Sequence, residues 1–476
     1  MTGSIRLKRV KPAAKVGIIH IGPGAFFRAF NAVYTHEAMA LAGGDWGILA
    51  VSLKSTKARD QLLPQGYMYT SVTRSQSGSR HDIIGAIVDV RAAPENPLSI
   101  VKAMADPAVK IVSMTITEKG YCHEPATGRL NLNHPDIQHD LAHLDTPKSA
   151  VGFIVAALSR RKDAGLSSFT VLSCDNLPSN GKLARSVVLE FARLISADLS
   201  DWIEENATFP ATMVDRITPA TTTEDIARLE AEAGYYDPAC VVHEAFRQWV
   251  IEDDFVDGRP EWESVGAQMV DSVAAHETMK LRCLNGTHST LAYLGYLAGF
   301  ETIADCVANP DFAALCEKLW REEIMPTLQP PDGEDLDSYC ARLLERYRDP
   351  TIRHLTWQIA MDGSQKLPQR ILGTISDNLA NGTIPRGLVL AVAAWMRYVG
   401  GADENGEPID VRDPLADRLK QISDASIDKV SALLNIEEVF SRELADNPQF
   451  RDAVAAAYNS ISENGTFDAV QSYVRA

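Results

Sequence analysis

A short apolar segment that runs directly into a glycine turn constrains the fold of this chain most strongly. Val16–Ile21 is β-branched and apolar, as expected for a buried parallel strand. It ends in Gly22-Pro23-Gly24, and apolar residues then recur at helical spacing from Ala25 to Met39. Strand, glycine turn and helix form the first unit of a dinucleotide-binding fold, in which a pyrophosphate approaches the N–H groups at the helix N-terminus. Because Phe27 occupies the third small position of the G-x-G-x-x-G fingerprint, a tight turn that binds nothing is an equal alternative.

Strand-like and helical segments alternate through the first half of the chain, which predicts an α/β domain with a mainly parallel sheet and an antiparallel insertion near residues 67–90. Two polar clusters, Thr117–Tyr121 and Ser173–Gly181, follow predicted strands, where such sheets bind ligands. After the second strand, Leu53-Lys54-Ser55 stands where a NAD-selective site commonly has an acidic residue. Lys54 is either a solvated side chain or a partner for a 2′-phosphate, so both NAD and NADP remain open.

Helical patterns dominate after about residue 275. We therefore predict two domains: a Rossmann-type dinucleotide-binding domain over residues 1–277, and a mainly α-helical substrate and catalytic domain over residues 278–476.

Composition limits the possible partners and the compartment. The formal net charge of −17 argues against a general nucleic-acid binder, and no apolar run approaches the roughly 18 residues that span a bilayer. The seven cysteines are scattered and form no C-x-x-C pair, which favours free, mostly buried thiols in the cytoplasm over a zinc site. No metal-ligand spacing is present, and the dipeptide His243-Glu244 is expected to be structural. The basic N-terminal segment, residues 1–15, is expected to be an exposed lead-in to the first strand.

The segment Met279–Ser289 places polar groups on a predicted buried helix. On a wheel of about 100° per residue, Glu277, Lys280, Asn285 and His288 lie within about 140° of one another and share this arc with leucines. Burying such groups is costly unless each finds a partner. One explanation is a reaction at a secondary alcohol or ketone, with a desolvated lysine as general base, amides at the alkoxide and a histidine that orients the substrate. The alternative is a buried polar network that joins the two domains.

Three motifs together resemble the mannitol dehydrogenase family of polyol-specific long-chain dehydrogenases, over nearly the whole chain. The segment Gly22–Phe30 is similar to the family's cofactor loop, usually G-x-G-x-F-H-R-A-H, with phenylalanines at positions 27 and 30 where histidines are common. Phe209–Pro219 contains the family's V-D-R-I motif, and Met279–Ser289 contains its K-x-x-x-x-N-x-x-H motif.

The resemblance implies a role for each matching residue and an active site in the cleft between the two domains. Lys280 is the implied general acid/base, Asn176 and Asn285 the oxyanion pair, and His288 the group that orients the substrate. Asp215, Glu277 and Lys366 are implied in or beside the substrate pocket. Gly22, Gly24, Phe26 and Arg28 are implied to bind the cofactor. No metal is implied.

Within the family, several stretches, among them Thr115–Cys122 and Gln358–Arg370, resemble fructuronate reductase (D-mannonate oxidoreductase) more than mannitol 2-dehydrogenase. The first substrate carries a carboxylate, for which Arg370 is our candidate partner; the alternative is an arginine on a helix surface. We expect an enzyme that interconverts D-mannonate and D-fructuronate with NAD or NADP, as a monomer or dimer. The alternatives are a mannitol 2-dehydrogenase or related polyol dehydrogenase, and a catalytically silent nucleotide-binding protein.

Overall fold

A computed structural model describes residues 5–76, 78–124 and 127–476. The chain divides into two compact units, the first ending at Ala274 and the second beginning at Ala275. Among the described residues, none of the helices is both long and apolar enough to pass through a membrane.

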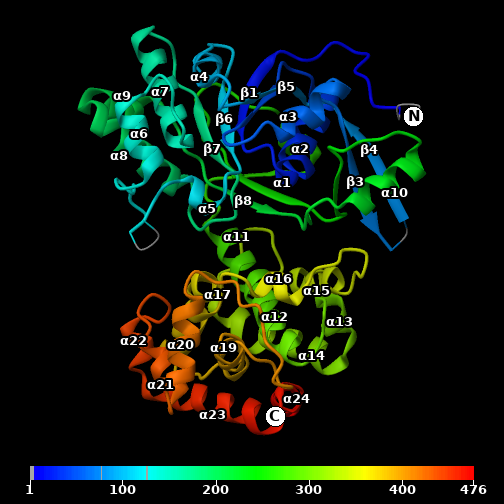
Figure 1. The fold of residues 1–476 in the computed structure, drawn as a ribbon, viewed down its shortest axis with the longest axis vertical. Helices are drawn as coiled ribbons and strands as arrows, with labels where there is room; N and C mark the ends of the chain where they lie inside the picture. Colours follow the sequence, from blue (N-terminus) through cyan, green and yellow to red (C-terminus); the bar gives the residue numbers. More distant parts are fainter. Residues whose placement is uncertain (1–4, 77, 125–126) are drawn as a thin grey trace. The chain divides into compact units, whose positions relative to one another are not determined.

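The first unit is built on a five-stranded parallel sheet with strand order β5-β2-β1-β6-β7. Figure 1 labels β1, β5, β6 and β7 of this sheet. Its strands are β1 (Val16–Ile21), β2 (Gly47–Ser52), β5 (Ile87–Ala92), β6 (Ile111–Met114) and β7 (Thr170–Ser173). Two three-stranded sheets accompany it, one of β8 (Thr212–Asp215), β10 (Gln248–Glu252) and β11 (Gln268–Val270), the other of β3 (Tyr69–Ser75), β4 (Gly78–Ile84) and β9 (Val241–Glu244). The antiparallel pair β3–β4 confirms the predicted insertion.

Both faces of the five-stranded sheet are buried, as its continuous apolar strands require. Neighbouring residues of β1 point to opposite faces, so Ile18 and Ile19 belong to different hydrophobic cores. The helices of this unit are α1 (Ala25–Ala29), α2 (Asn31–Ala42), α3 (Lys57–Leu62), α4 (Pro97–Met104), α5 (Thr117–Gly120), α6 (Pro135–Ala142), α7 (Ala150–Asp163), α8 (Asn180–Ile195), α9 (Ala197–Asn206) and α10 (Thr223–Ala233), with 3₁₀ turns η1 (Leu63–Gln65) and η2 (Trp262–Val265).

One local expectation was wrong, and a second held only in part. The predicted helix from Ala25 to Met39 is two helices, because Phe30 leaves the helical region with φ −130° and ψ −86°. The N-terminal segment is not simply exposed. Leu7 is buried, and Arg9 donates hydrogen bonds to the carbonyls of Gly66 (2.9 Å), Gly85 (3.0 Å) and Ile87 (2.6 Å). Residues 1–4 of that expected lead-in lie outside the described residues.

The second unit is helical around one core, in which α12 and α19 are buried along nearly their whole lengths. A helix that is apolar on all sides belongs at a domain centre, which explains the two longest apolar segments of this half. Its α-helices are α11 (Ala274–Met279), α12 (Thr287–Leu297), α13 (Ile303–Ala308), α14 (Pro310–Lys318), α15 (Leu336–Tyr347), α16 (Thr356–Ala360), α17 (Gly363–Leu367), α18 (Gly373–Ala380), α19 (Arg386–Tyr398), α20 (Ala416–Ala425), α21 (Lys429–Leu434), α22 (Arg442–Ala445), α23 (Pro448–Asn464) and α24 (Thr466–Arg475).

Three π-helical segments interrupt these helices, and none was predicted. They are η3 (Lys280–Gly286), η4 (Leu319–Ile324) and η6 (Pro368–Leu372); η5 (Met325–Thr327) is a 3₁₀ turn. Together, the five-stranded parallel sheet and the helical second unit confirm the predicted fold class.

Candidate active site

The glycine turn after β1 has the geometry of a phosphate-binding loop. Gly22 has φ +96°, and a Cβ placed there would lie 2.1 Å from the Thr115 carbonyl oxygen, so only glycine fits. Gly24 precedes α1, and a Cβ there would meet no atom nearer than the Gly22 oxygen at 4.0 Å. The turn therefore requires glycine at position 22 and is open at Gly24, which fits a pyrophosphate against the backbone at the start of α1.

Phe27, which departs from the glycine fingerprint, packs its ring against strand β1. It is buried and stacks on His20 of β1, with ring centroids 3.6 Å apart and planes 9° apart. His20 is held by Ser113 Oγ at 2.8 Å and Thr115 Oγ1 at 2.9 Å, and burial lowers its pKa to about 3. The stacked rings pack α1 against β1 at the place where the usual fingerprint has a small residue.

Phe26 and Arg28, both implied to bind the cofactor, face the protein in different ways. Phe26 is half-buried and stacks on Phe30, 5.0 Å between centroids. The buried Arg28 donates from Nη1 to the Pro23 carbonyl at 2.6 Å, and Tyr69 donates to the Arg28 carbonyl at 2.5 Å. Arg28 thus holds the glycine turn in place. Beyond β2, Lys54 is exposed, with no acidic side chain in the segment Leu53–Ser55.

The two polar clusters predicted at the strand ends come together through one carboxylate. Asp175, two residues after the end of β7, accepts hydrogen bonds from the amides of Ile116 (3.0 Å) and Thr117 (2.8 Å) and from the hydroxyl of Tyr121 (2.8 Å). Thr117 adopts a φ of +64°, which these bonds help to hold. Asn176 is the next residue, so its backbone is anchored to β6 and β7.

A second anchor lies on the other side of Asn176. The buried amide of Asn180 donates to the carbonyls of Asp175 (2.9 Å) and Thr212 (2.8 Å), and its oxygen accepts from the Thr212 amide (3.0 Å). Asp215, the last residue of β8, is buried. Asn176 and Asp215 thus stand at the ends of two strands that the Asn180 side chain joins.

In the second unit, the predicted catalytic stripe lies on a π-helical turn rather than on a continuous α-helix. Lys280 and Asn285 are both in η3, His288 follows in α12, and all three are buried. Glu277 is half-buried on α11. The α-helical wheel separates Lys280 and Asn285 by about 140°. A π-helix bonds residue i to i+5 and turns through a smaller angle per residue than an α-helix, so the angle between Lys280 and Asn285 is smaller than the wheel predicted.

His288 lies among aromatic and basic side chains. Its ring is 4.6 Å from that of Tyr347 and 4.8 Å from that of His354, edge to face. Burial is the largest cause that holds its pKa well below the usual value, followed by the charges of His354, Arg346, Arg370 and Lys280. Among the described residues, its Nε2 has no hydrogen-bond partner. A neutral imidazole with a free nitrogen is suited to bind a substrate hydroxyl.

Lys366 lies on α17 and Arg370 on η6, and the charge of Arg370 acts on His288. Lys366 donates to the carbonyls of Ile359 (3.2 Å) and Met361 (2.5 Å), and burial followed by Arg370 lowers its pKa to about 8. Arg370 is half-buried and donates to Ser289 Oγ at 3.1 Å, next to His288; burial lowers its pKa to about 10. It is therefore not the solvated helix-surface arginine that was the alternative.

Sequence reasoning missed Arg346 and His354, which the fold adds to this group. Both influence His288, and burial, followed by Arg346 and Arg370, lowers the pKa of His354 to about 4. No local motif singles them out, because they come from α15 and the loop before α16. We call Lys280, Arg346, Lys366 and Arg370 with His288 and His354 the basic cluster.

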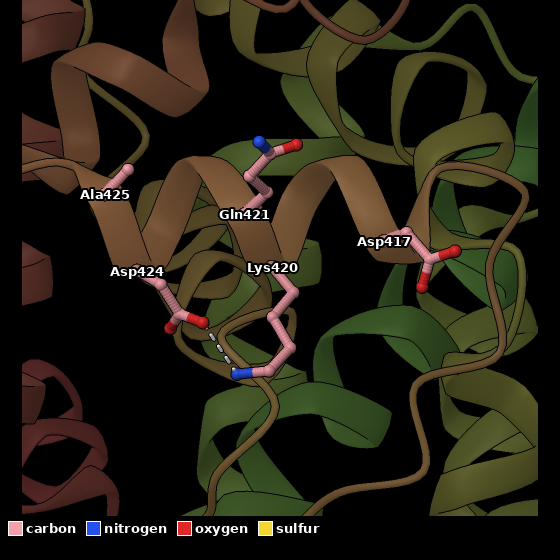
Figure 2. Close-up of a pocket in the computed structure, with 5 residues that line it drawn as sticks. All are labelled: Asp417, Lys420, Gln421, Asp424 and Ala425. Atoms are coloured by element: carbon pink, nitrogen blue, oxygen red, sulfur yellow. Dashed lines mark hydrogen bonds and ion pairs between the residues drawn. The ribbon is translucent and has the colours of Figure 1, made fainter.

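A surface pocket on α20, shown in Figure 2, is lined by Asp417, Lys420, Gln421, Asp424 and Ala425. All five are exposed, and Lys420 pairs with Asp424 at 3.0 Å. Such exposed pairs carry little energy, and no predicted site residue lines the pocket.

His243 and the cysteines lie in the protein core. His243 accepts or donates at Ser71 Oγ (2.6 Å) and the Glu244 carbonyl (2.8 Å), as expected for a buried core residue. All seven cysteines are free and buried, which confirms the expected thiols. Across residues 5–76, 78–124 and 127–476, no three His, Cys, Asp or Glu side chains are grouped as metal ligands.

Comparison with known proteins covers both units. Residues 16–264 match the mannitol dehydrogenase Rossmann domain, and residues 272–462 match the mannitol dehydrogenase C-terminal domain. The chain is 47% identical to D-mannonate oxidoreductase of Escherichia coli (strain K12), over 95% of this chain and 94% of that protein. It is 40% identical to mannitol 2-dehydrogenase of Aspergillus fumigatus, over 97% of this chain and 94% of that protein.

A solved structure resembles the whole chain. The ternary complex of Pseudomonas fluorescens mannitol 2-dehydrogenase with NAD and D-mannitol aligns with a TM-score of 0.90 and 38% identity, covering 100% of this chain and 97% of that one. With both domain models matched and relatives of this identity over nearly its full length, the chain belongs to the mannitol dehydrogenase family.

Proposed function

We propose that this NAD-dependent oxidoreductase interconverts D-mannonate and D-fructuronate. The class of reaction, at a CH–OH group of a polyol or sugar acid, agrees with its relatives, which include a D-mannonate oxidoreductase and mannitol 2-dehydrogenases. The choice of the acid over the polyol rests on the basic cluster.

The charge of the basic cluster supports an anionic substrate. Arg370 lowers the pKa of Lys366 and, with Arg346, that of His354, so these groups repel one another when protonated. The acids that oppose this effect at Lys366 are Asp362 and Asp413. Asp413 already accepts from the backbone and hydroxyl of Ser364, at 2.7 and 2.6 Å. Placing several cationic side chains close together out of water is costly, and a substrate carboxylate would offset part of that cost through charge-assisted hydrogen bonds. The neutral hydroxymethyl group of mannitol would not.

In the proposed reaction the cofactor takes the hydride and a lysine takes the proton. NAD, when bound, accepts the hydride from the carbinol carbon. In the same direction, Lys280 Nζ takes the hydroxyl proton, and in ketone reduction it returns it. The side-chain amides of Asn176 and Asn285 donate to the oxygen as its charge develops. His288 Nε2 binds a neighbouring hydroxyl, and Arg370 binds the carboxylate. Asp215, Glu277 and Lys366 shape the substrate pocket.

The glycine turn is proposed to hold the cofactor's pyrophosphate at Gly22 and Gly24, with Phe26 and Arg28 supporting it. The charge of the exposed Lys54 would attract a 2′-phosphate, so NADP is proposed as a second, weaker cofactor. The cytoplasm is the proposed compartment, since seven buried free thiols suit reducing surroundings.

One assay tests the substrate. Oxidation of NADH is measured with D-fructuronate and with D-fructose side by side, and repeated with NADPH. We expect a higher kcat/KM for fructuronate; a higher value for fructose would contradict the acid as substrate. Mannitol and fructose are then the second candidate pair, which the D-mannitol complex of the solved relative favours. If the protein binds NADH and oxidises it with neither, the silent nucleotide-binding protein is the remaining reading.

A further inference from the structure

The π-helical turn η3 needs an explanation, because such turns are rarer than α-helical ones and persist where something stabilises them. It spans Lys280–Gly286 and is continuous with α11 before it and α12 after it. The turn carries two of the proposed catalytic residues, Lys280 and Asn285.

Two side chains from distant elements bind the end of this turn. Trp320, in η4, donates from Nε1 to the Cys283 carbonyl at 2.9 Å. Tyr347, the last residue of α15, donates its hydroxyl to the Leu284 carbonyl at 3.0 Å. In an uninterrupted α-helix these two carbonyls accept from the amides of Thr287 and His288. In the structure the Thr287 amide donates instead to the Leu284 carbonyl, which also accepts from Tyr347. The side-chain donors therefore supplement the backbone bonds at the point where the α-helical register is lost.

Tyr347 makes a second contact that joins the turn to His288. Its ring lies 4.6 Å from the His288 ring, with planes 30° apart, and 6.2 Å from the Trp320 ring. Trp320 and Tyr347 are each 2% exposed, so water does not compete for either hydrogen bond. One tyrosine thus fixes both the backbone of the π turn and one face of the substrate-binding histidine.

We propose that Tyr347 and Trp320 are positioning residues: their donors hold η3 in its π form and thereby place Lys280 and Asn285 on one face. Without them, the segment relaxes toward the α register, which separates the two side chains by about 140° around the helix axis. This proposal rests on the roles proposed above for Lys280 and Asn285.

The test compares two isosteric variants. Tyr347→Phe removes the bond to Leu284 and keeps the ring beside His288. Tyr293→Phe is the matched control, because the Tyr293 hydroxyl donates to the Ala360 carbonyl at 3.2 Å, in the same unit and outside the π turn. Trp320→Phe removes the other donor. Each protein is examined by steady-state kinetics, by the primary isotope effect with 4-deuterated NADH, by NADH affinity and by thermal unfolding.

For Tyr347→Phe and Trp320→Phe we expect kcat to fall tenfold or more, since small misplacements of catalytic groups can cost up to about a hundredfold. The isotope effect should rise, because hydride transfer becomes slower, while NADH affinity stays within twofold of the parent. Tyr293→Phe should lose a similar amount of thermal stability and keep its kcat within about twofold.

Equal kcat losses in Tyr347→Phe and Tyr293→Phe would overturn the proposal, as would parent-like kcat in both Tyr347→Phe and Trp320→Phe. Lys280→Ala in the same series separates this from the proposed function: if it keeps its turnover, the proposed role of Lys280 fails. Hydrogen exchange at the amides of residues 284–288 then tests, independently of catalysis, whether Tyr347 holds the π turn. Faster exchange in Tyr347→Phe than in Tyr293→Phe supports it, and equal exchange refutes it.

Discussion

Replacing Arg370 with glutamine tests how the protein distinguishes an acid from a polyol. The guanidinium is half-buried, donates to Ser289 Oγ at 3.1 Å and lowers the pKa of Lys366. A hydrogen bond to a charged group contributes about 1.5–3 kcal/mol. Lys366 remains beside the site and still attracts the substrate carboxylate. We therefore expect transition-state binding to weaken by about 2 kcal/mol, which corresponds to about thirtyfold in kcat/KM for fructuronate.

The substrate without a carboxylate provides the internal reference. With fructose, Arg370→Gln removes no bond to a substrate carboxylate, and kcat/KM should change by less than about threefold. Arg451→Gln is the matched control, because Arg451 is also half-buried in the second unit and donates to a serine hydroxyl, Ser431 Oγ, at 2.9 Å. It should leave both substrates unaffected.

The variant also has a predicted effect on pH dependence. Removing the Arg370 charge should raise the pKa of Lys366 from about 8 toward its usual value. Any alkaline limb of the fructuronate profile that reports loss of the Lys366 charge should therefore move to higher pH. Equal losses of kcat/KM for fructuronate and fructose in Arg370→Gln would refute the carboxylate assignment.

Four further predictions concern catalysis, cofactor choice and stability. Lys280→Ala should lose at least about a hundredfold in kcat and still bind NADH, as fluorescence titration would show; near-parent turnover would remove its acid/base role. Lys54→Asp should raise the preference for NADH over NADPH in kcat/KM, and an unchanged ratio would exclude Lys54 from the ribose site. Gly22→Ala should abolish NADH binding, since its Cβ would lie 2.1 Å from a carbonyl oxygen, whereas Gly24→Ala should still fold. Finally, His243, with a pKa lowered to about 3, stays neutral when folded but protonates when unfolded. Stability from this group is therefore present above pH 6.5 and falls as the pH drops toward 3, by at most about 1.4 kcal/mol per pH unit, visible as a falling unfolding midpoint.

Local pattern was enough to predict the strand, glycine turn and helix that open the chain, because the apolar run and the glycines act over a few residues. The same holds for the change to a helical second half. The spacing of Lys280, Asn285 and His288 placed them within one arc of about 140° on an α-helix, and their catalytic roles stay a prediction. The three motifs that resemble the mannitol dehydrogenase family also lie in the sequence itself, and the domain matches confirm that family.

What tertiary structure decided is how those groups are held. The π turn is invisible to an amphipathic pattern, because its hydrogen-bond register depends on Trp320 and Tyr347, which lie 37 and 63 residues from their acceptors. The break at Phe30 and the place of Phe27 depend on aromatic partners from other elements, and Arg346 and His354 reach the basic cluster only through the packing of α15 and the loop before α16. Neighbours in sequence set the type and rough face of each element; contacts over long sequence distances set the register and the charge around the site.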